Sequence, residues 1–146
     1  VSSWTWSALT TAVDFYTLAN YQRVRVIIDG ITLGSSDRLA IRVSIDNGAT
    51  FISAGYASQA SNDGTGTTST AAFVLMDTAG TSIVNGVIDI NLLNTNTKAA
   101  LSGFVNNIDK VIGLGPSGIN NSIRITTIGG ANITGGSMKL LGWRSH

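Results

Sequence analysis

Alternation of apolar and polar residues dominates the chain, and a period of two predicts strands rather than helices. In the first clear run, Val24, Val26 and Ile28 fall on one side of an extended chain. The opposite side carries Arg23, Arg25, Ile27 and Asp29. A second run follows the four-residue turn 34–37, with Leu39, Ile41, Val43 and Ile45 alternating with Arg38, Ala40, Arg42 and Ser44.

These two runs predict a hairpin closed by the turn at 34–37. Its register pairs Val26 with Ile45, Ile28 with Val43, Arg25 with Asp46 and Asp29 with Arg42. Each opposed ion pair would contribute roughly 0.2–1 kcal/mol. A slip of one residue would bury the charges and expose the aliphatic side chains. The arginines are therefore interpreted as a solvated, paired sheet face rather than as a ligand site.

Further strands are expected along the rest of the chain. An Asn-Gly turn at 46–48 leads to a short strand at 51–56, and later strands are predicted at 83–93, 108–114, 119–128 and 137–143. Residues 98–107 fit either a strand or a short helix, and residues 57–82 read as a long functional or mobile loop. About eight short strands joined by glycine-rich turns predict an all-β fold: one antiparallel β-sandwich domain of jelly-roll type over residues 1–146.

Composition narrows the possible partners. Charged residues make up 12% of the chain, and nine basic residues face eight acidic ones for a formal net charge of +1. This balance gives no electrostatic case for nucleic acid, and no apolar run is long enough for membrane insertion. Cysteine is absent from the sequence, so disulfides and thiolate metal sites are excluded.

Candidate chemistry is sparse, and we expect neither an enzyme nor a cofactor. Glutamate is absent, and the single histidine, His146, is the last residue. A glycosidase pair would therefore need two aspartates, of which Asp63 and Asp77 are the ones in the long loop. Asn62 and Asp63 resemble a fragment of a calcium loop, but the regular ligand spacing and the closing glutamate are missing, so a turn explains them better and no metal is expected.

Aromatic and polar side chains supply the candidate ligand-binding residues, which are Trp4, Trp6, Tyr56, Asn62 and Asp63. Exposed tryptophan rings would stack on sugar faces or on a neighbouring subunit, and buried ones would seal the ends of the core. The core interpretation is favoured for the tryptophans. Several apolar residues are expected on outer faces: Ile27, Val87, Leu93, Leu141 and Trp143. Their number suggests that another subunit covers part of the sheet and that the protein is a homo-oligomer.

Three segments resemble β-sandwich modules of bacteriophage virion appendages, the tail fibres, tail tips and head spikes or fibres. They are WSALTTAVDFYTLANYQRVRVIIDGITL, DRLAIRVSIDNGATFISAGY and ITGGSMKLLGW, and the resemblance covers most of residues 4–56 and 119–143. It implies a rigid, non-enzymatic, often trimeric module on the virion surface that contacts other virion proteins and host-surface polysaccharide.

Three other functions remain open. The first is a capsid or tail decoration protein with no glycan ligand, and the second is a cellular carbohydrate-binding module. A small hydrolase using Asp63 and Asp77 comes last, because no nucleophile stands beside a base.

Overall fold

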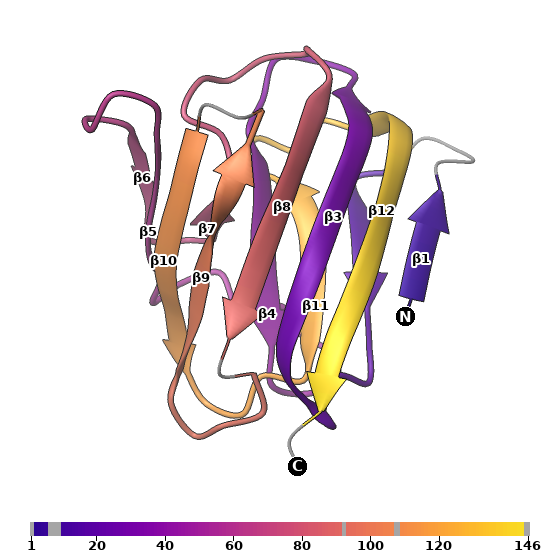
Figure 1. The fold of residues 1–146 in the computed structure, drawn as a ribbon, viewed down its shortest axis with the longest axis vertical. Helices are drawn as coiled ribbons and strands as arrows, with labels where there is room; N and C mark the ends of the chain where they lie inside the picture. Colours follow the sequence, from indigo (N-terminus) through magenta and orange to yellow (C-terminus); the bar gives the residue numbers. More distant parts are fainter. Residues whose placement is uncertain (1, 6–9, 92, 107–108, 145–146) are drawn as a thin grey trace.

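Two antiparallel sheets packed face to face make up the protein. The structure, a computed structural model, describes residues 2–5, 10–91, 93–106 and 109–144, and in these ranges it contains strands and no helix (Figure 1). The predicted antiparallel β-sandwich is confirmed. Twelve strands are described instead of about eight. The segment 57–82 contains three short strands in place of one long loop, Ser2–Thr5 and Ala12–Phe15 are two further strands, and the strand expected at 51–56 is absent.

The larger sheet has eight strands and lies in front in Figure 1. In spatial order they are β1 (Ser2–Thr5), β12 (Ile133–Arg144), β3 (Tyr21–Leu33), β8 (Val84–Asn91), β9 (Lys98–Val105), β10 (Asp109–Ser117), β5 (Ala57–Ser61) and β6 (Thr67–Ser69). Within the segment 98–107, which the sequence left open between strand and helix, Lys98–Val105 form strand β9.

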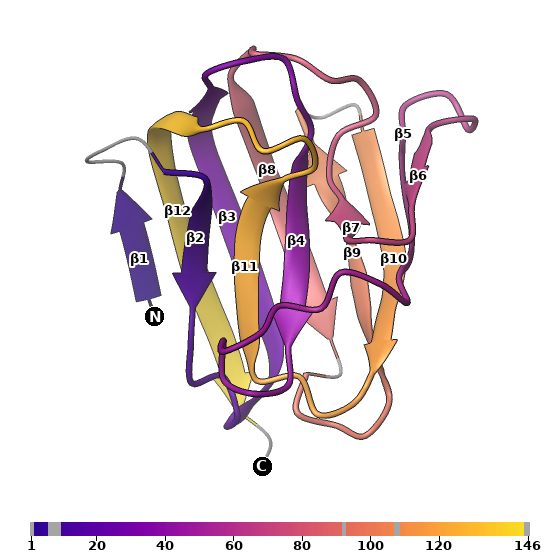
Figure 2. The ribbon, with the colours of Figure 1, turned by 180° about the vertical axis from the view of Figure 1, so that it is seen from behind.

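The smaller sheet has four strands and lies in front in Figure 2. In spatial order they are β2 (Ala12–Phe15), β11 (Ser122–Thr127), β4 (Leu39–Ser44) and β7 (Phe73–Val74). This sheet covers one face of the larger sheet and leaves the other face open.

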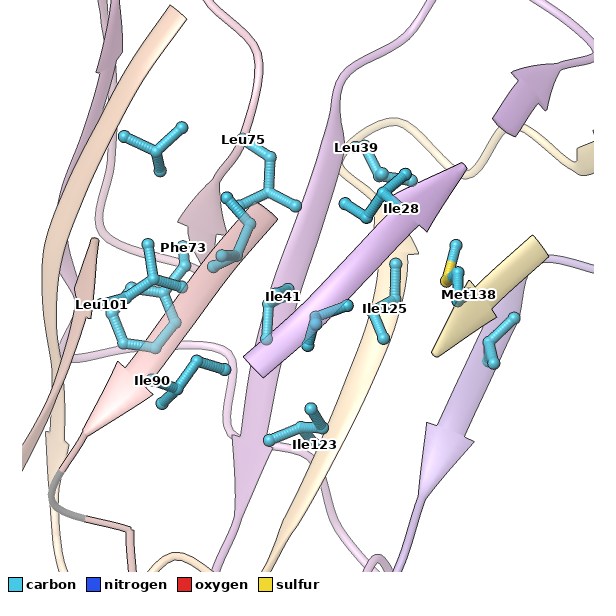
Figure 3. Close-up of a cluster of buried hydrophobic side chains, with 14 of the residues drawn as sticks. Ile28, Leu39, Ile41, Phe73, Leu75, Ile90, Leu101, Ile123, Ile125 and Met138 are labelled. Carbon is cyan, nitrogen blue, oxygen red and sulfur yellow. The ribbon is translucent and has the colours of Figure 1, made fainter. Parts of the chain in front are cut away.

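The core fills the space between the sheets with the apolar side chains that the alternation predicts (Figure 3). Val26 and Val43 are fully buried there, one from each sheet. Ile90 and Leu101 from the larger sheet and Ile123 from the smaller one extend the same layer. Close packing of such branched side chains is the main stabilising contribution to the sandwich.

The predicted hairpin between the first two alternating runs is wrong. Strand β3 pairs with β8 and β12 in the larger sheet, whereas β4 pairs with β11 and β7 in the smaller sheet. The connection at 34–38 crosses from one layer to the other, so the apolar sides of the two strands face each other across the core instead of lying side by side. The predicted ion pairs Arg25–Asp46 and Asp29–Arg42 are absent from the described residues, since Arg25 binds Asp89 and the Arg42 side chain donates to the Ala71 carbonyl.

Of the other local predictions, one is confirmed and three are wrong. The turn at 46–48 is confirmed, with φ of +56° at Asn47 and +88° at Gly48. Residues 51–56 are not a strand. Ile45, predicted inside, is 52% exposed, and Leu93, predicted outside, is fully buried. Strand β4 ends at Ser44 and β8 at Asn91, so neither residue keeps the alternation of the strand before it.

No helix in the described ranges is long and apolar enough to cross a membrane.

Candidate functional site: the open face of the eight-stranded sheet

The outer face of the larger sheet carries apolar side chains that the core does not use. Buried Val26 and Ile88 point toward the smaller sheet, and their chain neighbours point outward. One of these outward neighbours is Val87, which is 44% exposed. Beside it on strand β9 lies Phe104, which also points outward and is 58% exposed. Figure 1 looks onto this face.

Strand β10 reverses the usual distribution of large and small residues in a half-buried strand. Its large side chains Ile112 and Leu114 point outward and are 46% and 47% exposed. Val111 is buried on the inward side, but the inward positions that flank Leu114 are Gly113 and Gly115, against which the ring of Phe73 packs. A Cβ at Gly113 would lie 2.7 Å from the Cδ1 of Phe73. The core thus takes its bulk here from β7, and the aliphatic side chains of β10 face solvent.

One cross-strand row on this face runs from lysine to lysine. The register of β12, β3, β8, β9 and β10 aligns Lys139, Ile27, Val87, Phe104 and Lys110. Neighbouring strands lie roughly 4.8 Å apart, so the two lysines are separated by four spacings, about 19 Å. Between them lies an apolar strip with an exposed aromatic ring.

Four adjoining hollows follow this face from β12 to β6. Their volumes are about 450, 320, 310 and 620 Å3. The first two share Val87 and Phe104, the second and third share Lys110 and Ile112, and the last two share Gln59. We call these connected hollows the trough. It is shallow, open along its length, and longer than any single hollow.

The largest hollow combines aliphatic walls with hydrogen-bonding groups. Ile112 and Leu114 line it from β10, and Gln59, Thr68 and Thr70 line it from β5, β6 and the residue after β6. Hydroxyl and amide groups can both donate and accept hydrogen bonds. This end of the trough can therefore hold a ligand that has both an apolar surface and several hydroxyls.

A charged cluster flanks the trough on β12, β3 and β8. Arg25 binds Asp89 through Nε and Nη2, each at 2.8 Å, and Arg23 Nη2 lies 3.0 Å from the same carboxylate. Both guanidinium groups lie over the indole of Trp143, at 5.0 and 5.8 Å from the ring centroid. The hydrogen bond from Arg25 lowers the pKa of Asp89 most, burial opposes it, and Arg23 lowers it further. The cluster stays ionised at neutral pH.

The structure places Tyr56, one of the sequence-predicted site residues, mainly in the core. Its side chain is 3% exposed, and its hydroxyl accepts the Val43 N–H at 2.9 Å and donates to the Ile52 carbonyl at 3.0 Å. Burial raises the pKa of this hydroxyl to about 12. Tyr56 borders the largest hollow but has a structural role there.

Asn62 and Asp63 lie in the turn between β5 and β6. Asn62 lines the 310 Å3 hollow together with Lys110, so this predicted residue does meet the trough. Asp63 instead closes the turn, because its Oδ1 accepts the N–H and the hydroxyl of Thr65, which lower the pKa of the carboxyl. In the described part of the chain, no group of three acidic, histidine or cysteine side chains could hold a metal ion.

Of the two N-terminal tryptophans, the described structure places only the backbone of Trp4. Trp4 is in β1, where its backbone pairs with Met138 of β12, and Trp6 lies outside the described residues. His146 also lies outside them. Asp77 is held by contacts with β6 and β10, since its N–H donates to Asp109 and its Oδ1 accepts the Thr67 N–H.

The sequence analysis missed Phe104, Lys110, Ile112 and Leu114 as site residues. The signal for two of them was the segment Ile112-Gly113-Leu114-Gly115, in which large residues alternate with glycine instead of with polar residues. Phe104 lies in the segment whose structure the sequence left open.

No protein-family model matches the chain, and no curated relative matches it. Solved structures with a similar fold include the galectin LEC-6 of Caenorhabditis elegans, with 17% identity, a TM-score of 0.48 and coverage of 99% of this chain and 96% of that one. The homodimeric agglutinin CG-16 from chicken liver has 12% identity and a TM-score of 0.43, with 89% and 99% covered. A toad ovary galectin in complex with thio-digalactose has 11% identity and a TM-score of 0.43, with 90% and 99% covered.

Proposed function

We propose that the protein is a non-catalytic binding module that takes a carbohydrate chain across the outer face of its eight-stranded sheet. The observation that carries the proposal is the trough, in which connected hollows combine an exposed aromatic ring, aliphatic walls and polar groups. A pyranose ring offers a complementary surface, because it has apolar C–H faces and a rim of hydroxyls.

The shape of the trough favours a polymer over a small substrate. Sites for small molecules are usually enclosed and bury most of the ligand surface. Here the hollows are open and continue from one strand to the next, and Phe104 lies where two of them meet. Several sugar units lying across the strands would fill them together.

The placement on a phage particle rests on the resemblance of residues 4–56 and 119–143 to virion-appendage modules. On that basis the module would sit at the virion surface and contact host-surface polysaccharide during adsorption. The trimer and the contacts with other virion proteins stay predictions of the same resemblance.

A second candidate function is self-association through the same face. Val87, Phe104, Ile112 and Leu114 are each 44–58% exposed, and exposed apolar side chains that gather on one face are typical of protein interfaces. In that case the face would be covered by another copy of the chain, and the homo-oligomer would need it.

Substitution of the exposed ring separates the two. We expect Phe104→Ala to weaken polysaccharide binding about tenfold, equivalent to roughly 1.4 kcal/mol, because the ring supplies the apolar platform. Binding would be measured by calorimetry on a panel of neutral and charged polysaccharides, including bacterial capsule and lipopolysaccharide fractions. Ile83→Ala is the control, since Ile83 is 60% exposed and does not line the trough.

Unchanged affinity of the Phe104→Ala protein, or failure of the parent protein to bind any member of the panel, would overturn the proposal. Sedimentation of the same variants tests the second candidate, which predicts that Phe104→Ala dissociates an oligomer that Ile83→Ala leaves intact.

A further inference from the structure

Positive charge gathers on the face that carries the trough. Five cationic residues point outward from the larger sheet: Arg23, Arg25, Lys98, Lys110 and Lys139. They include all three lysines of the chain. Two acidic residues, Asp29 and Asp89, share the face, which leaves a surplus of three positive charges in a protein of net charge +1. The remainder of the molecule therefore carries a surplus of two negative charges.

The lysines at the two ends of the apolar row are free to bind a ligand. Arg23 and Arg25 are already engaged with Asp89. Lys110 and Lys139 are exposed, and within the described ranges neither has an ion-pair partner. Lys139 lines the first hollow, and Lys110 lines the second and third. Unpaired ammonium groups thus border the trough at both ends of the row.

From this placement we infer that the carbohydrate bound in the trough is an anionic polysaccharide, with carboxylate, phosphate or sulfate groups recurring along its chain. The inference rests on the proposed function and specifies its ligand. The ammonium groups of Lys110 and Lys139 bind two such groups, and the apolar strip between them contacts the sugar rings.

The spacing of the charges favours a sparsely charged polymer over a nucleic acid. Lys110 and Lys139 are about 19 Å apart, at four strand spacings. Each strand of duplex DNA carries one phosphate per roughly 3.4 Å and would place about six phosphates over that distance. The strip between the lysines holds Ile27, Val87 and Phe104, which offer no counter-charge to phosphates. A polysaccharide with an acidic group on every few sugars matches this pattern.

Matched polymers that differ only in charge test the inference. The first pair is polygalacturonate and its fully methyl-esterified form, and the second is dextran sulfate and dextran. We expect the protein to bind the anionic member of a pair at least tenfold more tightly than the neutral member. That difference should shrink as salt is added, because counterions screen exposed charges.

Two lysine variants locate the effect. Lys110→Gln with Lys139→Gln should remove most of the preference for the anionic member, and Lys110→Arg with Lys139→Arg should keep it. The control adds two acids away from the trough, Thr11→Asp and Ser36→Asp, both at exposed positions. The glutamine pair and the aspartate pair give the protein the same formal net charge, so any difference between them reports where the charge lies. Circular dichroism would verify that all variants fold.

Equal affinity for the charged and neutral members, or binding to neither anionic polymer, overturns the inference; retained binding elsewhere on the wider polysaccharide panel would leave the proposed function standing. Absence of binding to every polysaccharide defeats both. Tighter binding to a thirty-residue oligothymidylate than to either anionic polysaccharide would assign the face to nucleic acid instead.

Discussion

Asp37 is the one acidic side chain that is buried in the described structure, where it is 8% exposed. It lies near the end of the connection from β3 to β4, and its carboxylate accepts backbone N–H groups from Arg38, Gly129 and Ala131 at 2.7–3.0 Å. The last two belong to the connection between β11 and β12. One side chain therefore joins two connections that each pass between the sheets.

This arrangement predicts a pH-dependent loss of stability on replacement of Asp37. Burial alone would raise the pKa of Asp37, but the N–H donors of Ala131, Gly129 and Arg38 outweigh it and lower the pKa below its ordinary value of 3.8. The stabilisation is therefore present above pH 3.8 and is lost as the pH falls through the lowered value in the folded protein. We expect Asp37→Asn to lower the free energy of unfolding at pH 7 by roughly 1–3 kcal/mol.

Urea unfolding at pH 7 and at pH 3 would measure this effect. The gap between Asp37→Asn and the parent protein should narrow at the lower pH. Asp29→Asn, at an exposed site on β3, is the control and should change stability by less than about 0.5 kcal/mol. A gap that is equal at both pH values would contradict the role given to the carboxylate.

For strands β3 and β4, the alternation predicts correctly which side faces the core but not which strand lies beside each. Val26 and Val43 were expected inside and are inside. Their strands were expected to pair and do not, because a period of two is satisfied by any partner that covers the apolar side. Arg25 illustrates the cause: its partner Asp89 is 64 residues away along the chain, whereas the nearer Asp46 instead accepts a hydrogen bond from Ser44.

Strand β10 explains why the site was harder to predict than the core. Ile112 and Leu114 have the residue types of a core strand, and burial of large aliphatic residues is the general expectation. Their outward direction follows from Gly113 and Gly115, which leave room for Phe73 from a strand that the sequence presented as a loop. The alternation with glycine is visible in the sequence, but the ring that fills the inward side comes from a distant segment that local alternation does not identify.

The close pairing of β8 with β9 depends on Gly103 of β9. A Cβ at Gly103 would lie 2.3 Å from the carbonyl oxygen of Val87 and 2.9 Å from the Cα of Ile88. We expect Gly103→Ala to destabilise the protein by roughly 1–3 kcal/mol or more, because backbone atoms of β8 would have to move. Thermal unfolding would show it as a lowered Tm.

Gly80→Ala is the matched control for this substitution. Its new Cβ would meet no atom closer than 3.9 Å, and its φ is not in the left-handed region. An equal fall in Tm for Gly80→Ala and Gly103→Ala would contradict the close approach of β8 and β9.

At the scale of the whole molecule, the uneven charge makes the protein a dipole across the sandwich. The open face of the larger sheet has a surplus of positive charge, and the remainder has a surplus of negative charge. We expect the protein to bind a cation-exchange resin through the open face even though its net charge is only +1. The paired Lys110→Gln and Lys139→Gln substitutions should elute at lower salt than the paired Thr11→Asp and Ser36→Asp substitutions. Identical elution would mean that net charge alone governs retention.

The glycine-backed strand β10 also bears on how such a protein can change over evolution. The ring of Phe73 fills its inward side, and Ile112 and Leu114 on the outward side are 46% and 47% exposed. Mutations at Ile112 or Leu114 can therefore alter what the molecule recognises without loosening its architecture. The outer face can therefore change its ligand in the course of evolution while the residues of the core stay the same.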